Sequence, residues 1–186
     1  MAHDHPRDHP HDHDHAHDDS TSCAHAHARA AALPEARAAA EAACAERGVR
    51  LTPIRRAVLE ALLESHAPMG AYEILDALNA KGAQDGPGES KAGRGLAPIA
   101  VYRALDFLIE QGFAHKLESR NAFTACPHAH APHELVAFLI CETCGGVDEL
   151  APAPLAKAVG QMLAQERFAP RRQVLEITGA CAHCRD

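Results

Sequence analysis

Apolar residues recur at every third or fourth position in three segments of the chain, which is the spacing of a helix that buries one face. This pattern predicts helices from Thr52-Pro53 onward, at 71–78 and at 98–111. A further helix is predicted at 34–47, because this segment is rich in alanine, the best helix former. Pro34 and Pro53 suit first helical turns, where a missing N–H group needs no partner, and Gly48 suits a helix end. The hydroxyl of Thr52 can cap the second helix.

The segment between the third and fourth helices, residues 81–97, is rich in Gly and charge and is expected to form a flexible loop. After Gly112 the period changes, because apolar and polar residues mix at short spacing in 113–118 and in 121–124. These two stretches predict a two-stranded hairpin. Helices followed by a hairpin are the order of a winged helix, whose last helix would enter the major groove of DNA.

The chain from Cys126 onward predicts a second unit made of short strands and one helix. A short apolar run at 135–141 indicates a buried strand, with 147–150 as a candidate to pair with it. A helix that begins with proline follows at 154–168, and a further strand at 172–178. The edges of so small a sheet could be covered by dimerisation.

These elements predict an α+β chain in which an N-terminal winged-helix DNA-binding domain precedes a small α/β dimerisation domain. The expected limits are 31–122 for the first domain, 123–126 for a hinge and 127–186 for the second domain. Residues 1–30, rich in His and Asp, form a low-complexity tail that is expected to be disordered. This tail could bind divalent metals loosely or merely keep the chain in solution.

The formal net charge of −7 at first argues against a nucleic-acid partner, but the charge is unevenly placed. Residues 1–28 hold six Asp and one Arg and so contribute −5, which leaves the rest of the chain nearly neutral. Contacts with phosphate need positive charge locally rather than over the whole molecule. The charge balance therefore does not exclude DNA binding.

The hydropathy of the chain indicates a cytoplasmic protein without a membrane partner. No apolar run approaches the length that spans a bilayer, and the N-terminal stretch lacks the apolar core of a secretory signal. In a reducing compartment, cysteines are more often metal ligands or reactive thiols than disulfides.

Two Cys-x-x-Cys pairs form the strongest chemical signal in the sequence, namely Cys141 with Cys144 and Cys181 with Cys184. Each pair places two sulfurs on one tight turn, so that four thiolates can surround a single zinc ion tetrahedrally. Such a shell leaves no open position, which predicts a structural site. The alternatives are a redox-active pair and buried free thiols, which two matched pairs rarely represent.

A second group of possible ligands is scattered across the hairpin and the second unit: His115, Cys126, His133 and Glu149. Mixed nitrogen, sulfur and oxygen ligands suit tetrahedral zinc. Ligands drawn from both units would let the metal fix the angle between them. By spacing alone this signal is weak, because His128 and His130 compete with His133 and a solvated surface histidine is the ordinary explanation for any one of them.

Three stretches resemble the ferric uptake regulator superfamily: Leu51-Thr52-Pro53, the run VYRALDFLIEQGF at 101–113, and CETCG at 141–145. Within that superfamily, the stretch 102–119, in which His115 is followed by Lys-Leu-Glu-Ser, is particularly similar to the zinc uptake regulators. The resemblance covers about residues 34–184 and leaves the His-rich tail outside.

The resemblance implies a homodimer of winged-helix domains that carries metal at the hinge and binds palindromic double-stranded operator DNA. It implies two zinc ions per subunit, a structural one at Cys141, Cys144, Cys181 and Cys184, and a regulatory one at His115, Cys126, His133 and Glu149. The DNA-reading residues of the family match Tyr72, Tyr102 and Arg103. From the residues alone, Tyr102 would be an ordinary helix surface residue and Arg103 an ion-pair partner of a neighbouring acid.

The resemblance also favours zinc over iron. The iron and peroxide branches of the superfamily usually carry a dense His-His-Asp-His run before the strand of the first Cys-x-x-Cys pair, where this chain has His-Ala-His-Ala-Pro-His at 128–133. The soft thiolate of Cys126 suits zinc as well. The expected function is a zinc-dependent repressor of zinc uptake genes. The alternatives are an iron or peroxide sensor of the same fold and, from a different class, a zinc-buffering protein that acts through its tail.

An enzyme is not expected. A zinc hydrolase or deaminase needs an open metal position and a general base. The chain contains neither a His-Glu-x-x-His motif nor a His-x-Glu motif followed by Pro-Cys-x-x-Cys. We therefore expect no small-molecule substrate.

Overall fold

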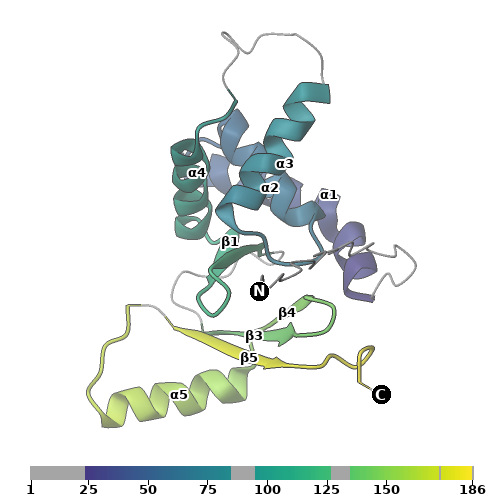
Figure 1. The fold of residues 1–186 in the computed structure, drawn as a ribbon. Coiled ribbons are helices and arrows are strands. Elements are labelled where there is room, and N and C mark those ends of the chain that lie inside the picture. Colours follow the sequence, from purple (N-terminus) through teal and green to yellow (C-terminus); the bar gives the residue numbers. More distant parts are fainter. Residues whose placement is uncertain (1–23, 85–94, 127–134, 172, 186) are drawn as a thin grey trace, which may run out of the picture.

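The computed structural model describes residues 24–84, 95–126, 135–171 and 173–185. Within these residues, helices α1 to α4 and the hairpin form an upper body, and a separate sheet with helix α5 lies beneath the hairpin (Figure 1). The upper body contains α1 (Ala24–Glu46), α2 (Pro53–Glu64), α3 (Ala71–Gln84), α4 (Pro98–Glu110), β1 (Ala114–Leu117) and β2 (Ala122–Ala125). The lower body contains β3 (Val136–Cys141), β4 (Val147–Leu150), α5 (Ala153–Gln165) and β5 (Val174–Gly179). This is the α+β architecture that the sequence predicts.

The core of the upper body lies between α2 and α4, whose apolar stripes face each other. Leu62 and Leu105 are fully buried there, with Val58 and Val101 beside them. Each buried leucine stabilises the fold by about 1.5–3 kcal/mol. Cys44 of α1 joins the same cluster at 3% exposure, so this thiol behaves as a small apolar side chain.

The hairpin β1–β2 closes this body on its lower side. The two strands pair antiparallel, with Ala114 opposite Ala125, and Phe123 forms an isolated bridge with Met69 in the segment before α3. The last turn of α4 ends at Gly112, whose φ of +75° favours glycine and turns the chain into β1.

The lower body is a three-stranded sheet in the order β4-β3-β5. β3 is antiparallel to β4 and parallel to β5, and α5 lies on the crossover between β4 and β5. Phe138 and Ile140 of β3 form an apolar cluster with Val147 of β4 and with Leu117 of the hairpin. Because Leu117 belongs to this second cluster, the hairpin rests directly on the sheet.

Three local predictions need correction. α1 begins at Ala24 rather than at Pro34, because the alanines before the proline have a high helix propensity and carry the helix through it. α3 continues to Gln84 and so takes in the first residues of the loop expected at 81–97. Thr52 occupies the N-cap of α2, but its hydroxyl makes no capping bond, and the helix starts from the Thr52 carbonyl accepting the N–H of Arg56 at 2.9 Å.

The expected hinge at 123–126 also overlaps the hairpin. β2 extends through Ala125 because its register with β1 pairs that residue with Ala114, so three of the four hinge residues are strand. The tail expected at 1–30 overlaps the first residues of α1, and the rest of it lies outside the described residues. In the part of the chain that the structure describes, no helix is long and apolar enough to cross a membrane.

Two candidate metal centres and a candidate DNA-reading face

The first candidate centre forms where the ends of β3 and β5 lie side by side. Their parallel register pairs Cys141 with Gly179, and the N–H of Glu142 donates to the carbonyl of Gly179 at 2.8 Å. A tight turn follows each strand, and a φ of +72° at Gly145 lets the first turn close. The sulfurs of Cys141, Cys144, Cys181 and Cys184 all lie within 4.8 Å of one another. The four cysteines that the sequence pairs are thus brought together.

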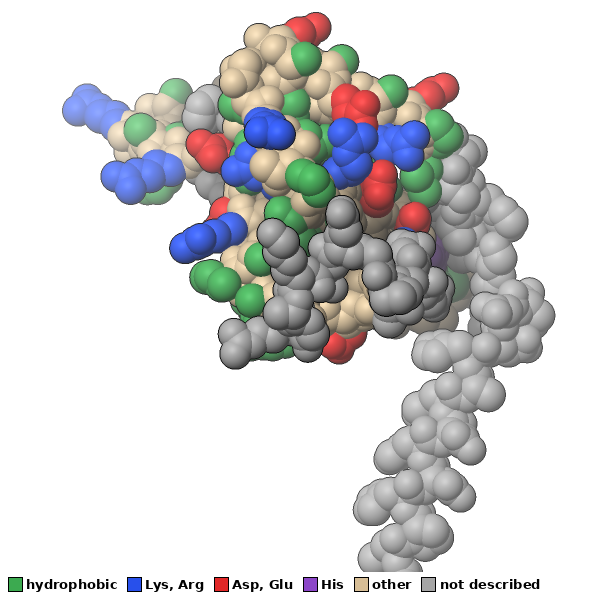
Figure 2. All heavy atoms as spheres, turned by 90° about the horizontal axis from the view of Figure 1, so that it is seen from above, with side chains coloured by type: hydrophobic (Ala, Val, Ile, Leu, Met, Phe, Trp, Pro, Cys, Tyr) green, Lys and Arg blue, Asp and Glu red, His purple; other side chains and the backbone are tan. Residues whose placement is uncertain are grey.

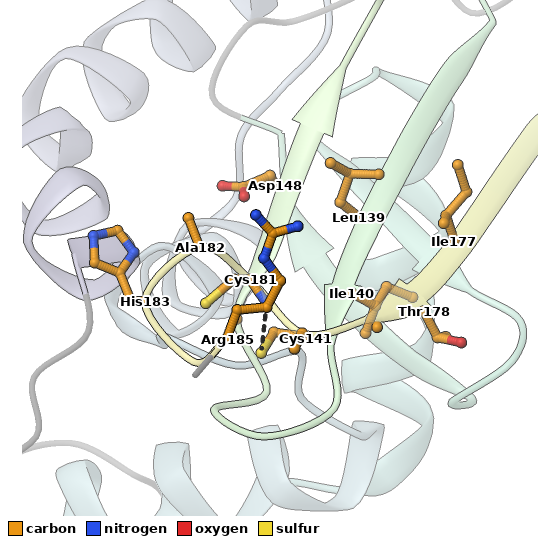
Figure 3. Close-up of a pocket in the computed structure, with 13 residues that line it drawn as sticks. Leu139, Ile140, Cys141, Asp148, Ile177, Thr178, Cys181, Ala182, His183 and Arg185 are labelled. Carbon is orange, nitrogen blue, oxygen red and sulfur yellow. Dashed lines mark hydrogen bonds between the residues drawn. The ribbon is translucent and has the colours of Figure 1, made fainter.

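Backbone hydrogen bonds prepare this cluster for a cation. N–H groups of Cys144 and Cys181 point at the sulfur of Cys141 and lower the pKa of that thiol to about 5. The N–H of Cys181 lies 3.4 Å from this sulfur (Figure 3). The pKa of Cys184 is raised to about 11, first by its hydrogen bond with the side chain of Cys181 and then by burial. The thiols of the cluster therefore differ in how readily they lose their protons, because the pKa of Cys141 is lowered and that of Cys184 is raised.

The second candidate centre lies between the hairpin and the sheet. His115 comes from β1, Cys126 follows β2, and Glu149 belongs to β4. The Cys126 thiol lies 3.3 Å from Oε1 of Glu149, and His115 Nε2 lies 3.4 Å from the same oxygen. One possible ligand atom from each of the three residues lies within 4.8 Å of the other two. His133, the fourth expected ligand, lies outside the described residues, as do its competitors His128 and His130.

The surroundings of this second group favour a cation. The side chain of Glu149 is only 7% exposed and that of His115 18%. A carboxylate in such a place is costly unless a positive charge neutralises it. The imidazole of His115 is also fixed in orientation, because its ring packs edge-on against Phe138 with the centroids 5.1 Å apart. Nitrogen, sulfur and oxygen donors converging on one point form a donor set that suits zinc.

The three residues expected to read DNA are exposed on helices of the upper body. Tyr72 on α3 is 63% exposed, Tyr102 on α4 is 40% exposed, and Arg103 beside it is exposed as well. Within the described residues Arg103 makes no hydrogen bond or ion pair, whereas Arg56 pairs with Glu41. An ion pair with a neighbouring acid, the ordinary structural role for Arg103, is therefore not found among the described residues. Figure 2 shows Lys and Arg side chains on the upper face, interspersed with acidic and apolar ones.

The sequence analysis did not predict the contacts that His66 and Glu176 make between the two bodies. His66, which follows α2, has its Nε2 3.1 Å from the carbonyl oxygen of Cys144. The neighbouring Ala67 packs closely against Gly145, because a Cβ added to Gly145 would lie 3.3 Å from the Cβ of Ala67. Glu176 of β5 contacts the turn of the hairpin. A lone histidine between helices and a glutamate in a strand carry no local signal for such contacts.

A cavity of about 390 Å³ lies beside the four-cysteine cluster (Figure 3). Leu139 and Ile177 line it, with Asp148 and Arg185 at its polar parts. By strand alternation, Leu139 points away from the hairpin that Phe138 and Ile140 contact. Leu139, Leu150, Met162, Phe168 and Ile177 leave large apolar side chains exposed on the lower body. Leu139 and Ile177 adjoin at this cavity, and adjoining exposed apolar side chains are typical of a protein interface.

The fold and its clusters define a winged-helix protein joined to a metal-binding α/β domain. The model of the ferric uptake regulator family matches residues 46–178, and the chain belongs to this family. The zinc uptake regulation protein of Escherichia coli (strain K12) is 39% identical over 150 residues, which cover 81% of each chain.

Two solved structures are similar along most of the chain. A zinc uptake regulator complexed with zinc and DNA is 38% identical, with a TM-score of 0.70 over 82% of this chain and 94% of the other. The holo form of XcZur is 42% identical, with a TM-score of 0.68 over 82% of this chain and 97% of the other.

Proposed function

We propose that the chain is a zinc-responsive repressor, which binds palindromic operator DNA as a homodimer when zinc-loaded and silences zinc uptake genes. The observation that carries this proposal is the convergence of His115, Cys126 and Glu149 from the two bodies of the molecule. The similarity to zinc uptake regulators, one of them complexed with zinc and DNA, supports it. The proposed role is that of a regulator and not an enzyme.

The position of the second centre explains how zinc would change DNA affinity. His115 and Cys126 belong to the winged-helix side, and Glu149 belongs to the dimerisation sheet. A ligand that needs all of them binds only the arrangement in which the hairpin lies on the sheet, and so it shifts the population toward that arrangement. Two winged helices fixed on one dimer would then match the two half-sites of an operator. His133 is proposed as the fourth ligand on the strength of the sequence.

The donor chemistry favours zinc over iron(II) or manganese(II), because the thiolate of Cys126 is a soft ligand. The four-cysteine cluster is proposed as a second, structural zinc site with no open position. The exposed apolar residues of the lower body are proposed to be covered by a second copy of the chain. A protein that only buffered zinc would not need a winged helix, and the similarity to a regulator complexed with zinc and DNA favours a DNA-binding role.

Operator binding is expected to rise at least about 100-fold when free zinc is raised through its buffered range, a coupling at the strong end of two-site systems. The measurement is fluorescence anisotropy with a labelled promoter fragment of a zinc importer, with iron(II) and manganese(II) in parallel metal buffers under anaerobic conditions. Binding driven by iron would move the protein to another branch of its family. An affinity that no metal changes would contradict the proposal and favour the buffering alternative.

Zinc loading of the four-cysteine cluster at pH 7.5 is expected to release at least one proton, because zinc binds thiolates and the raised pKa of Cys184 keeps this thiol protonated without metal. Zinc affinity should therefore increase with pH from neutrality toward the raised pKa of Cys184. Isothermal titration in buffers of different ionisation enthalpy counts the protons. A Cys126→Ser background removes the thiol of the second centre, and adding Cys184→Ser should lower the count by about one. A count of zero before that change would contradict the assignment.

A further inference from the structure

The tip of the hairpin is bound by a carboxylate of the dimerisation sheet. Glu176 of β5 accepts the backbone N–H of Glu118 at 2.7 Å through Oε1 and that of Ser119 at 3.1 Å through Oε2. The hydroxyl of Ser119 bonds to the same Oε2. One side chain thus takes three hydrogen bonds from two consecutive residues of the turn between β1 and β2.

The local structure explains why these donors are available. The turn at 118–121 lies beyond the last pair of the hairpin ladder, Leu117 with Ala122, so the N–H groups of Glu118 and Ser119 have no strand partner. The turn closes through Asn121, which adopts a φ of +45°. Peptide N–H groups need a partner or water. A carboxylate that receives two of them forms charge-assisted bonds, which are stronger than neutral ones.

The sheet register places Glu176 on β5 and the candidate metal ligand Glu149 on β4 at the same level, on either side of the central strand β3. Phe138 of β3 pairs with Glu149 on β4 and with Glu176 on β5. Both carboxylates contact the hairpin, so they flank the same residue on the face turned toward it. Glu149 meets the base of the hairpin at His115 and Cys126, while Glu176 meets its tip. Besides the apolar packing of Leu117, carboxylates of the sheet thus hold the hairpin at two points, and Glu176 lies outside the candidate metal centre.

We propose that Glu176 is a positioning residue, a metal-independent clamp that holds the hairpin tip on the dimerisation sheet and thereby sets the zinc sensitivity of the repressor. This inference rests on the proposed function. The affinity of a ligand for a protein that is only partly in the binding-competent arrangement falls in proportion to that fraction. With the clamp, more of the metal-free protein already brings His115 and Cys126 to Glu149.

The test compares zinc titrations of operator binding for Glu176→Ala, Glu176→Gln and the wild type. Glu176→Ala is expected to raise the free zinc at half-maximal binding roughly fivefold, the lower end of couplings between sites. Operator affinity at saturating zinc and the number of zinc ions bound should stay unchanged. Glu176→Gln keeps one acceptor oxygen and should recover part of the shift. Ser119→Ala should shift the midpoint less, and adding it to Glu176→Ala should shift it no further.

Glu118→Gln is the matched control, because it removes a charge from the same turn while leaving the N–H that Glu176 accepts. Its own carboxylate bonds to Lys116 at 2.6 Å, an exposed pair of small energetic value. The control should keep the wild-type midpoint. An equal shift in the control and in Glu176→Ala would reduce the effect to surface charge and overturn the clamp.

Hydrogen exchange of the metal-free full chain separates failure of the clamp from failure of the proposed function. The amides of Glu118 and Ser119 should exchange faster in Glu176→Ala than in the wild type, whatever the protein binds. Unchanged exchange at both amides, or an unchanged zinc midpoint, would overturn the clamp. A wild type with no zinc-dependent operator binding would overturn the proposed function instead, and the exchange measurement would still decide whether Glu176 holds the hairpin.

Discussion

Cys126→Ser protein is expected to lose its zinc response, with operator affinity at saturating zinc falling about 100-fold to that of the metal-free chain. A serine hydroxyl is a poor zinc ligand beside a thiolate, so the second centre would lose the donor that gives it preference for zinc. The backbone should keep its place, because the N–H of residue 126 still donates to the carbonyl of Phe113 at 2.9 Å. Anisotropy titrations and zinc counting measure the two consequences together.

The expected zinc count separates loss of the second centre from general misfolding. Cys126→Ser should retain one zinc per subunit in the four-cysteine cluster, whose ligands all lie at the ends of β3 and β5. Cys44→Ala is the matched control, since it removes a buried thiol of the helical core that contacts neither centre. That variant should keep its zinc response. Undiminished zinc-dependent binding by Cys126→Ser would show that the hinge assignment is wrong.

Most elements of the fold could be predicted because their signals are local. The stripe of Val101, Leu105 and Leu108 predicts α4, and Gly112 marks its end with a positive φ. The misplaced start of α1 has a physical reason, since helix propensity in an alanine-rich stretch outweighed the rule that proline opens a helix. At Thr52, the N-cap backbone is extended but the hydroxyl makes no capping bond. The sequence alone cannot distinguish an N-cap threonine that makes this bond from one that does not.

The two candidate centres differ in how much the sequence alone could say. Cys141 and Cys144 carry their own geometry, because a Cys-x-x-Cys turn needs no partner to place two sulfurs together. His115, Cys126 and Glu149 sit on or beside three different strands, and their convergence depends on the hairpin register and on the packing of hairpin against sheet. For them the family resemblance supplied what spacing could not, and the structure brings these three together.

The side-chain-to-backbone contacts between the two bodies could not be predicted from the sequence. His66 and Cys144 are 78 positions apart, and Glu118 and Glu176 are 58 positions apart. Their interactions run from side chain to backbone, so one partner in each pair has no residue-type signal at all. Such bonds depend on the three-dimensional register, in which Glu176 lies opposite Phe138.

Arg103→Ala protein is expected to bind operator at least roughly 30-fold more weakly at saturating zinc. An arginine that donates two hydrogen bonds to guanine contributes about 1–3 kcal/mol, and a dimer would lose this twice, about 2–6 kcal/mol in all. The fold should keep its stability to within about 0.5 kcal/mol, because the side chain is exposed and makes no ion pair with the described residues. Anisotropy measures the affinity, and thermal unfolding measures the stability.

Two measurements identify the kind of contact that Arg103 makes with DNA: the salt dependence of operator binding, and the operator affinity of a control variant that loses the same charge elsewhere. Arg171→Ala removes the same charge from an exposed position outside the winged helix and should leave operator affinity unchanged. A base contact predicts that Arg103→Ala weakens operator binding far more than binding to unrelated DNA, with little change in the salt slope. Equal weakening on both DNAs, with the slope reduced by about one, would make Arg103 a phosphate contact. If Arg103→Ala bound operator with wild-type affinity, Arg103 would lie outside the DNA interface. Recognition of the operator bases would then depend on Tyr72, Tyr102 and their neighbours.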